Sequence, residues 1–136
     1  MAEVSEEAEF PTGIDEVWKI VGDFGGFIEA MGMPVKLEGE GIGQTRTIEM
    51  GGPPMVERLE ERDETAKRLV YSIVSGPLPI ENYRSTMQLT EAGGATRLYW
   101  SGTFDAAEGA KEEDAANIVR SVYQGGIGGL KARFGG

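Results

Sequence analysis

The stretch that decides the fold begins with Tyr71-Ser72-Ile73-Val74 and continues through Tyr83-Arg84-Ser85-Thr86-Met87-Gln88-Leu89-Thr90 to Thr96-Arg97-Leu98-Tyr99-Trp100-Ser101-Gly102-Thr103-Phe104. Side chains alternate between the two faces of a strand. If Met87 lies opposite Trp100, one face carries Leu89 beside Leu98, Ser85 beside Gly102 and Tyr83 beside Phe104. That face is apolar and aromatic and has no charge, whereas the other face is polar. We therefore predict a hairpin whose apolar face covers either a helix or a ligand.

Composition sets the broad class of the protein. A chain of 136 residues with 40% hydrophobic and 26% charged residues suits one domain, 1–136, with a full core. No apolar run approaches the roughly 20 residues that span a bilayer, and the acidic start of the chain is unlike a secretory signal. We therefore expect a cytoplasmic protein with no membrane insertion. A net charge of −10 also disfavours binding to nucleic acid.

The chain contains neither cysteine nor histidine. It therefore has no disulfide, no thiolate nucleophile, no Ser-His-Asp triad and no imidazole metal ligand. The acidic clusters lack a calcium-loop pattern, and the glycine pairs lack the context of a phosphate-binding loop. We expect no metal and no cofactor, and any enzymatic proton transfer would depend on carboxylates, Tyr, Lys, Arg or water.

The remaining pattern predicts a complete order of elements. We expect strands at 4–10, 35–40, 45–50, 55–62 and 68–74 besides the two of the opening hairpin, short helices at 12–22 and 27–31, and a long helix at 111–134. Thr12 is the expected N-cap of the first helix, and Gly22 is expected to end it in a left-handed conformation. In the last helix, Gly125-Gly126 and Gly128-Gly129 interrupt an apolar stripe. They indicate tight packing on the sheet, or else a ligand contact or hinge.

Two charged residues fall on the inner face of the hairpin formed by 45–50 and 55–62. Pairing Met50 with Met55 places Ile48 opposite Glu57, so that Arg46 is the diagonal neighbour of Glu57. Because an unpaired buried charge is costly, we predict that Arg46 and Glu57 form an ion pair. The pair has two interpretations: a structural ion pair, or a polar anchor for a ligand carbonyl, carboxylate or phenol.

The order of elements resembles the helix-grip fold of the START-like (SRPBCC) superfamily. That superfamily includes Bet v 1-type proteins and the polyketide cyclase/dehydrase and lipid-transport family. The resemblance covers nearly the whole chain and rests on Val17-Trp18, Gly41-Ile42-Gly43, Glu57-Arg58-Leu59, Gly76-Pro77-Leu78-Pro79, Asn82-Tyr83, Trp100-Ser101-Gly102-Thr103-Phe104, Tyr123 and Gly129-Leu130. It implies an α+β fold in which a seven-stranded curved antiparallel sheet wraps a long C-terminal helix, with two short helices after the first strand. It also implies a cavity between sheet and helix.

We expect inward-facing residues of the sheet, the 24–31 segment and the last helix to bind the ligand. The candidates are Phe24, Phe27, Met31, Arg46, Ile48, Met50, Glu57, Tyr71, Ile73, Tyr83, Ser85, Met87, Trp100, Phe104, Tyr123 and Ile127. The aromatic members are alternatively plain core. Gly102 leaves a gap in the aromatic wall that suggests space. In relatives the 24–33 segment lies at the pocket mouth, where Gly25-Gly26 and the 76–79 loop would serve as gates; a hydrophobic cap without gating is the alternative.

Three functions are consistent with this sequence. The first is binding or transport of a small hydrophobic or amphipathic molecule, lipid-like or polyketide-like. The second is a polyketide cyclase, aromatase or dehydratase, in which Arg46, Glu57 and Tyr71 are the candidate catalytic residues. The third is a protein-interaction module similar to co-chaperone members of the superfamily, although the sequence indicates no particular protein partner.

Overall fold

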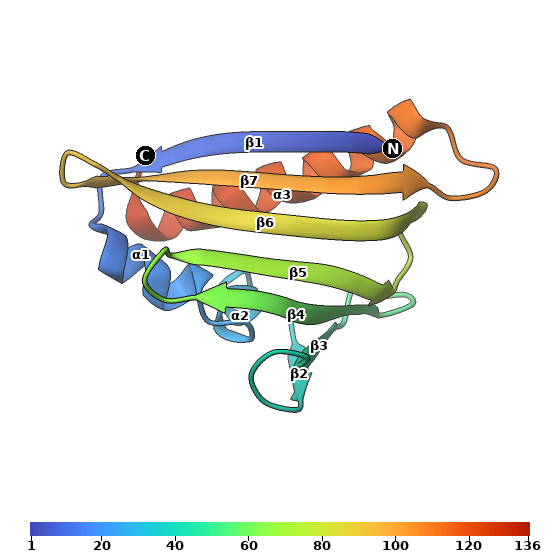
Figure 1. Ribbon diagram of the computed structural model, residues 1–136, viewed down its shortest axis with the longest axis horizontal. Coiled ribbons are helices and arrows are strands. Elements are labelled where there is room, and N and C mark those ends of the chain that lie inside the picture. The colour runs from blue at the N-terminus through green and yellow to red at the C-terminus, as the bar shows by residue number, and fades with distance from the viewer.

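The computed structural model describes residues 1–136 and contains one curved sheet with three helices on one of its faces (Figure 1). The elements are β1 (Ala2–Phe10), α1 (Ile14–Val21), α2 (Gly26–Ala30), β2 (Val35–Glu38), β3 (Thr45–Ile48), β4 (Met55–Asp63), β5 (Arg68–Ser75), β6 (Ile80–Ala92), β7 (Ala95–Ala106) and α3 (Glu112–Phe134). This order and the predicted fold class are confirmed. The largest difference in bounds is at β6, which begins at Ile80 instead of residue 83.

The seven strands form a single antiparallel sheet in the order β1-β7-β6-β5-β4-β3-β2. Figure 1 shows α3 crossing the sheet behind β6 and β7, while α1 lies beside the turn between β4 and β5 and α2 lies behind β4. The short strands β2 and β3 curl away from the long strands at the far edge. The cavity described below lies between this curled edge, α2 and the middle of α3.

The β6–β7 hairpin has the predicted register. Met87 pairs with Trp100, Leu89 with Leu98, and Ser85 with Gly102. A bulge interrupts the ladder between Glu81 and Arg84, where Asn82 adopts a positive φ of 55°. The rings of Tyr83 and Phe104 remain neighbours beside this bulge, with centroids 6.3 Å apart.

The predicted register of the β3–β4 hairpin is wrong by two residues. Ile48 pairs with Met55, and Arg46 lies directly opposite Glu57 instead of diagonally. The reason is the six-residue connection 49–54, which keeps Met50 outside the strand and 46% exposed. A slip of two residues preserves the face on which each side chain lies. Arg46 and Glu57 therefore still point inward, and they approach each other more closely than expected.

The predicted ends of α1 are also wrong. Gly13 is the N-cap residue, and no side chain caps the helix. The Thr12 hydroxyl donates instead to the Phe134 carbonyl at 2.9 Å, and the Thr96 hydroxyl donates to the Thr12 carbonyl at 2.7 Å. Thr12 therefore joins the end of α3 to β7. Gly22 ends α1 in a right-handed conformation, with φ −80° and ψ −5°.

The glycines of α3 allow close packing without breaking the helix. A Cβ on Gly126 would lie 2.7 Å from the Trp100 ring, and a Cβ on Gly129 would overlap the sulfur of Met31. Added Cβ atoms on Gly125 and Gly128 would meet nothing within 4 Å. Two of the four glycines therefore bring the helix backbone against β7 and α2. None of the helices is long and apolar enough to cross a membrane.

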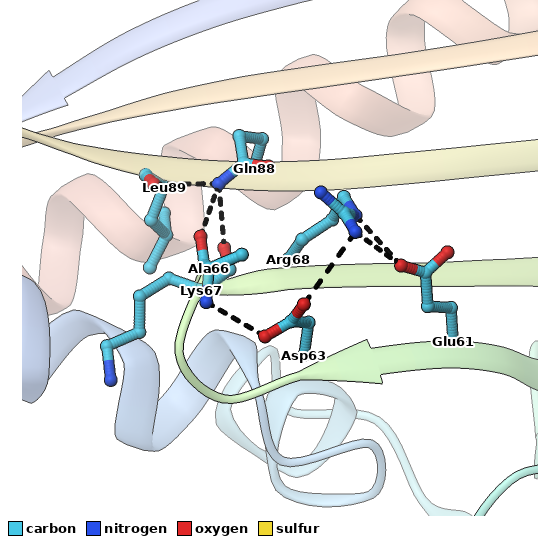
Figure 2. Close-up of polar contacts among 7 residues, drawn as sticks. All are labelled: Glu61, Asp63, Ala66, Lys67, Arg68, Gln88 and Leu89. Atoms are coloured by element: carbon cyan, nitrogen blue, oxygen red, sulfur yellow. Dashed lines mark hydrogen bonds and ion pairs between the residues drawn. The ribbon is translucent and has the colours of Figure 1, made fainter.

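Polar contacts fix the turn between β4 and β5 to its neighbour β6 (Figure 2). The Gln88 amide donates to the carbonyls of Ala66 at 2.6 Å and Leu89 at 3.0 Å. Arg68 forms ion pairs with Glu61 and Asp63 at N···O distances of 2.5 Å and 3.8 Å. These contacts hold three strands together, and none of the residues that form them lines the cavity described next.

Candidate functional site

A cavity of about 350 Å³ lies between α2, β3, β4 and the middle of α3. Its lining is mostly apolar and consists of Phe27, Ile28, Met31, Met33, Arg46, Ile48, Met50, Met55, Glu57, Tyr71, Trp100, Ser121, Val122, Gly125, Gly126 and Gly129. The volume falls within the range of roughly 300–1,000 Å³ that is usual for small-molecule pockets. The cavity opens beside α3, where Val122 and Met50 are exposed to solvent.

The charged end of the cavity is the Arg46–Glu57 ion pair. The Arg46 Nε donates to Glu57 Oε1 at 2.8 Å, and the two side chains are only 3% and 9% exposed. Arg46 Nη1 also donates to the Phe24 carbonyl at 2.8 Å, and the guanidinium lies 4.1 Å from the centroid of the Phe24 ring. The predicted pairing is confirmed. Because the guanidinium is held on two sides, its position is fixed before any ligand enters.

A hydroxyl network lies between the cavity and the core of the sheet. The hydroxyl oxygens of Tyr83 and Tyr123 are 2.5 Å apart, and that of Tyr123 lies 3.1 Å from Ser85 Oγ. The Trp100 Nε1 donates to Ser85 Oγ at 3.0 Å and to Tyr71 Oη at 3.3 Å. The Trp100 ring stacks on Tyr123 with centroids 4.4 Å apart. These polar atoms satisfy one another, so the aromatic rings are held rigidly.

Tyr123 also fills the gap that Gly102 was predicted to leave. A Cβ on Gly102 would overlap the Tyr123 hydroxyl oxygen. Gly102 is therefore needed because the hydroxyl of the helix residue lies against the backbone of β7. The interpretation of Gly102 as a sign of empty space is wrong, because the tyrosine that occupies the space comes from α3, outside the hairpin pattern.

Burial raises the pKa of Tyr71, Tyr83 and Tyr123 above the ordinary value of 10.0, and the nearby Glu57 carboxylate adds to the effect on Tyr71. Above pH 10 the unfolded chain loses phenol protons that the folded protein keeps. The stabilisation is therefore complete below about pH 10 and is lost as the pH rises further. We expect cooperative alkaline unfolding above pH 10. Circular dichroism monitors the loss of structure, and tyrosinate absorbance monitors ionisation of the phenols. Ionisation of these three phenols before the loss of structure would contradict this prediction.

The structure brings half of the sixteen predicted ligand-binding residues to the cavity wall. These are Phe27, Met31, Arg46, Ile48, Met50, Glu57, Tyr71 and Trp100. Phe24 lies behind Arg46. The residues Tyr83, Ser85, Met87, Phe104, Tyr123 and Ile127 are buried in the packed region between α3 and the long strands, away from the cavity wall. That these sixteen residues contact a ligand remains a prediction.

Ile73 lies at a different place. The ladder between β5 and β6 ends at the Ser72–Arg84 pair, and beyond it the two strands separate around the loop 76–79. Ile73 lines a polar hollow there of about 670 Å³, together with Arg58, Glu81 and one side of the otherwise buried Tyr83. The predicted gate loop 76–79 therefore borders this hollow and not the cavity beside α2.

Sequence reasoning did not include the helix residues Ser121, Val122, Gly125, Gly126 and Gly129 among the ligand-binding candidates, although they line the cavity. The available signal was the glycine pattern. A glycine on the inner side of a helix leaves either open space or room for a close neighbour. Gly125 leaves open space, whereas Gly126 and Gly129 admit Trp100 and Met31. The structure contains no group of three or more Asp or Glu side chains placed to hold a metal ion.

Comparison with known proteins agrees with this architecture. Residues 1–135 match the family model described as polyketide cyclase / dehydrase and lipid transport. The chain belongs to this family. No curated protein matches it. The match to the polyketide cyclase/dehydrase and lipid-transport family spans the sheet, the three helices and every residue that lines the cavity.

Several solved structures are similar over almost their whole length. XoxI from Bacillus cereus is 29% identical, with 98% of this chain and 96% of that chain covered and a TM-score of 0.89. A protein from Thermobifida fusca is also 29% identical, with 99% and 94% covered and a TM-score of 0.84. Ara h 8.0201, at 19% identity, 98% and 97% coverage and a TM-score of 0.76, shares the fold.

Proposed function

We propose that the protein binds a small, largely apolar molecule in the cavity between α2, β3–β4 and α3. The observation that supports this most directly is the lining of the cavity. It is apolar over most of its wall, and a single ion pair forms its charged end. Such a combination of apolar wall and few polar groups suits a molecule with a hydrophobic body and one polar end.

The wall is suited to a flat hydrophobic body. Phe27 and Trp100 meet edge to face with centroids 5.8 Å apart, and the Trp100 nitrogen is already occupied by Ser85 and Tyr71. These rings therefore offer the cavity apolar surface. Met31 and Met55 add flexible side chains that adapt to ligand shape. The ligand is expected to enter beside α3, where Val122 and Met50 are partly exposed.

A matched pair of substitutions in α3 tests this proposal. Gly125 and Gly128 both have open space at the Cβ position, but only Gly125 lines the cavity. Helical side chains cover the turn before their own residue, so a phenylalanine at 125 would lie toward Ser121 and Val122 at the mouth. Because this ring would occupy the mouth of the cavity, we expect Gly125→Phe to weaken binding of the neutral fluorescent probe prodan by about tenfold or more. A tenfold loss of affinity corresponds to about 1.4 kcal/mol of binding free energy.

Gly128→Phe is the control and is expected to bind prodan like the unmodified protein. Fluorescence titration measures the affinity, and mass spectrometry of the purified protein identifies any co-purified molecule. Equal binding by the two variants, or no probe binding by the unmodified protein, would contradict a ligand site in this cavity.

A cyclase or dehydratase is the second candidate, favoured by the position of Arg46 and Glu57 at the cavity wall. Arg46 would stabilise an enolate oxygen, and Glu57 would move the proton. The raised pKa of Tyr71 opposes a role for this tyrosine as general base. Product analysis distinguishes the two candidates. A binding protein returns a bound poly-β-ketone unchanged. A cyclase/dehydratase joins an enolate carbon of the substrate to one of its ketone carbons, and the resulting β-hydroxyketone loses its hydroxyl and an α-proton as one water, leaving a cyclic enone.

A further inference from the structure

The ion pair at the cavity end has two polar atoms that form no hydrogen bond with the protein. Arg46 uses Nε for Glu57 Oε1 and Nη1 for the Phe24 carbonyl, and no protein acceptor or donor hydrogen-bonds Arg46 Nη2 or Glu57 Oε2. The only fully enclosed side-chain polar atom without a partner is Nε1 of Trp18, so Nη2 and Oε2 both retain accessible surface. Both residues line the cavity. The cavity end thus presents one charged donor beside one charged acceptor.

Resting on the proposed function, we propose that this cavity selects an uncharged ligand group that carries a hydrogen-bond donor next to an acceptor. A primary amide has this arrangement, and so does a hydroxyl group beside a carbonyl. The acceptor receives a hydrogen bond from Arg46 Nη2, and the donor gives one to Glu57 Oε2. Buried polar groups need such partners, and hydrogen bonds to charged groups are the stronger kind.

Electrostatics disfavours a charged head group at the same place. Arg46 would attract a ligand carboxylate, but Glu57, which is joined to Arg46 at 2.8 Å, would repel it from almost the same position. The net attraction is small, whereas the cost of removing the anion from water remains. A ligand ammonium group would be attracted by Glu57 and repelled by Arg46, so its net attraction is small for the same reason. Neutral ligands with both functions avoid this cost and satisfy both free atoms.

Displacement of prodan from the full chain tests the inference with three compounds that share one ring system: 2-naphthamide, 2-naphthoate and 2-methylnaphthalene. We expect the amide to bind roughly tenfold or more tightly than either of the others, since hydrogen bonds to charged groups contribute at least that factor. Glu57→Gln removes the repulsion and is expected to shift the ratio of naphthoate to naphthamide affinity at least tenfold toward naphthoate. Glu108→Gln, which removes an exposed acid elsewhere, is the charge-matched control.

The outcomes separate the two proposals. If prodan binds but naphthoate competes as well as the amide, or the amide fails to compete, the inference about the head group is overturned while the binding function stands. If the hydrocarbon equals the amide, the ion pair does not contact the ligand, and the inference is again wrong. If neither prodan nor any of the three compounds binds, the proposed function fails and the inference fails with it. Should Glu57→Gln not fold, the comparison on the unmodified protein still decides.

Discussion

Replacing Arg46 with methionine is expected to lower the free energy of unfolding by about 3–5 kcal/mol, because breaking a buried ion pair leaves the other charge enclosed and uncompensated. In this variant Glu57 loses its only ionic partner, and the Phe24 carbonyl loses the hydrogen bond from Arg46. Both side chains are less than a tenth exposed, so water that enters through the cavity replaces the lost partner only in part. Urea unfolding followed by tryptophan fluorescence measures the change, since Trp18 and Trp100 are both buried.

Two controls give this result its meaning. The double variant Arg46→Met/Glu57→Met is expected to recover most of the lost stability, because apolar side chains of similar volume often replace a buried ion pair at little cost. Lys19→Met removes an exposed pair with Glu16, and its effect should stay below about 1 kcal/mol. A loss of less than about 1 kcal/mol for Arg46→Met would show that Glu57 is hydrated, and the description of an enclosed pair would be wrong.

The ion pair combines the two interpretations that the sequence left open. Its contact with the Phe24 carbonyl ties β3 to the segment before α2, which is a structural role. Both residues also line the cavity, and their Nη2 and Oε2 atoms have no hydrogen-bond partner in the protein, which suits a ligand anchor. The same rigidity serves both roles, because a polar group fixed in advance loses little freedom when a ligand binds.

The sequence predicted one hairpin register and missed the other for a physical reason. Between β6 and β7 the turn consists of Gly93 and Gly94, which both have positive φ angles of 61° and 89°. Two-residue turns of this kind fix the register of a hairpin by themselves. The six residues between β3 and β4 do not, and there the alternation of apolar side chains determines only the face. The prediction therefore placed Arg46 correctly on the inner face and incorrectly along the ladder.

The alternation of side chains along the strands could not predict the position of the cavity. The pattern predicted an apolar inner face on β6 and β7, and these residues are indeed buried. Whether such a face meets a ligand or a helix depends on where α3 lies across it. Tyr123 and Ile127 fill the space under the long strands, and Gly125 and Gly126 leave the remaining volume beside α2. That division follows from packing between elements far apart in the chain.

Tyr123→Ala is expected to destabilise the protein by about 3–5 kcal/mol, the usual range for removing a large buried aromatic side chain. Tyr123 is fully buried, stacks on Trp100 at 4.4 Å between centroids, and places its hydroxyl beside Tyr83 and Ser85. The alanine variant loses this packing and leaves a void that the neighbouring rings fill only in part. Urea unfolding at neutral pH measures the loss.

Tyr123→Phe separates the packing from the hydroxyl network. This variant keeps the ring and removes only the hydroxyl, so the expected loss is about 1–3 kcal/mol, the cost of leaving a buried partner unsatisfied. Ser85 retains the Ser101 carbonyl as acceptor at 2.9 Å, whereas Tyr83 keeps only the more distant Tyr71 hydroxyl at 3.4 Å and is the group most affected. If Tyr123→Phe were as damaging as Tyr123→Ala, hydrogen bonding and not ring packing would hold α3 on the sheet. If both variants lost less than about 1 kcal/mol, α3 would not depend on Tyr123 for its position on the sheet.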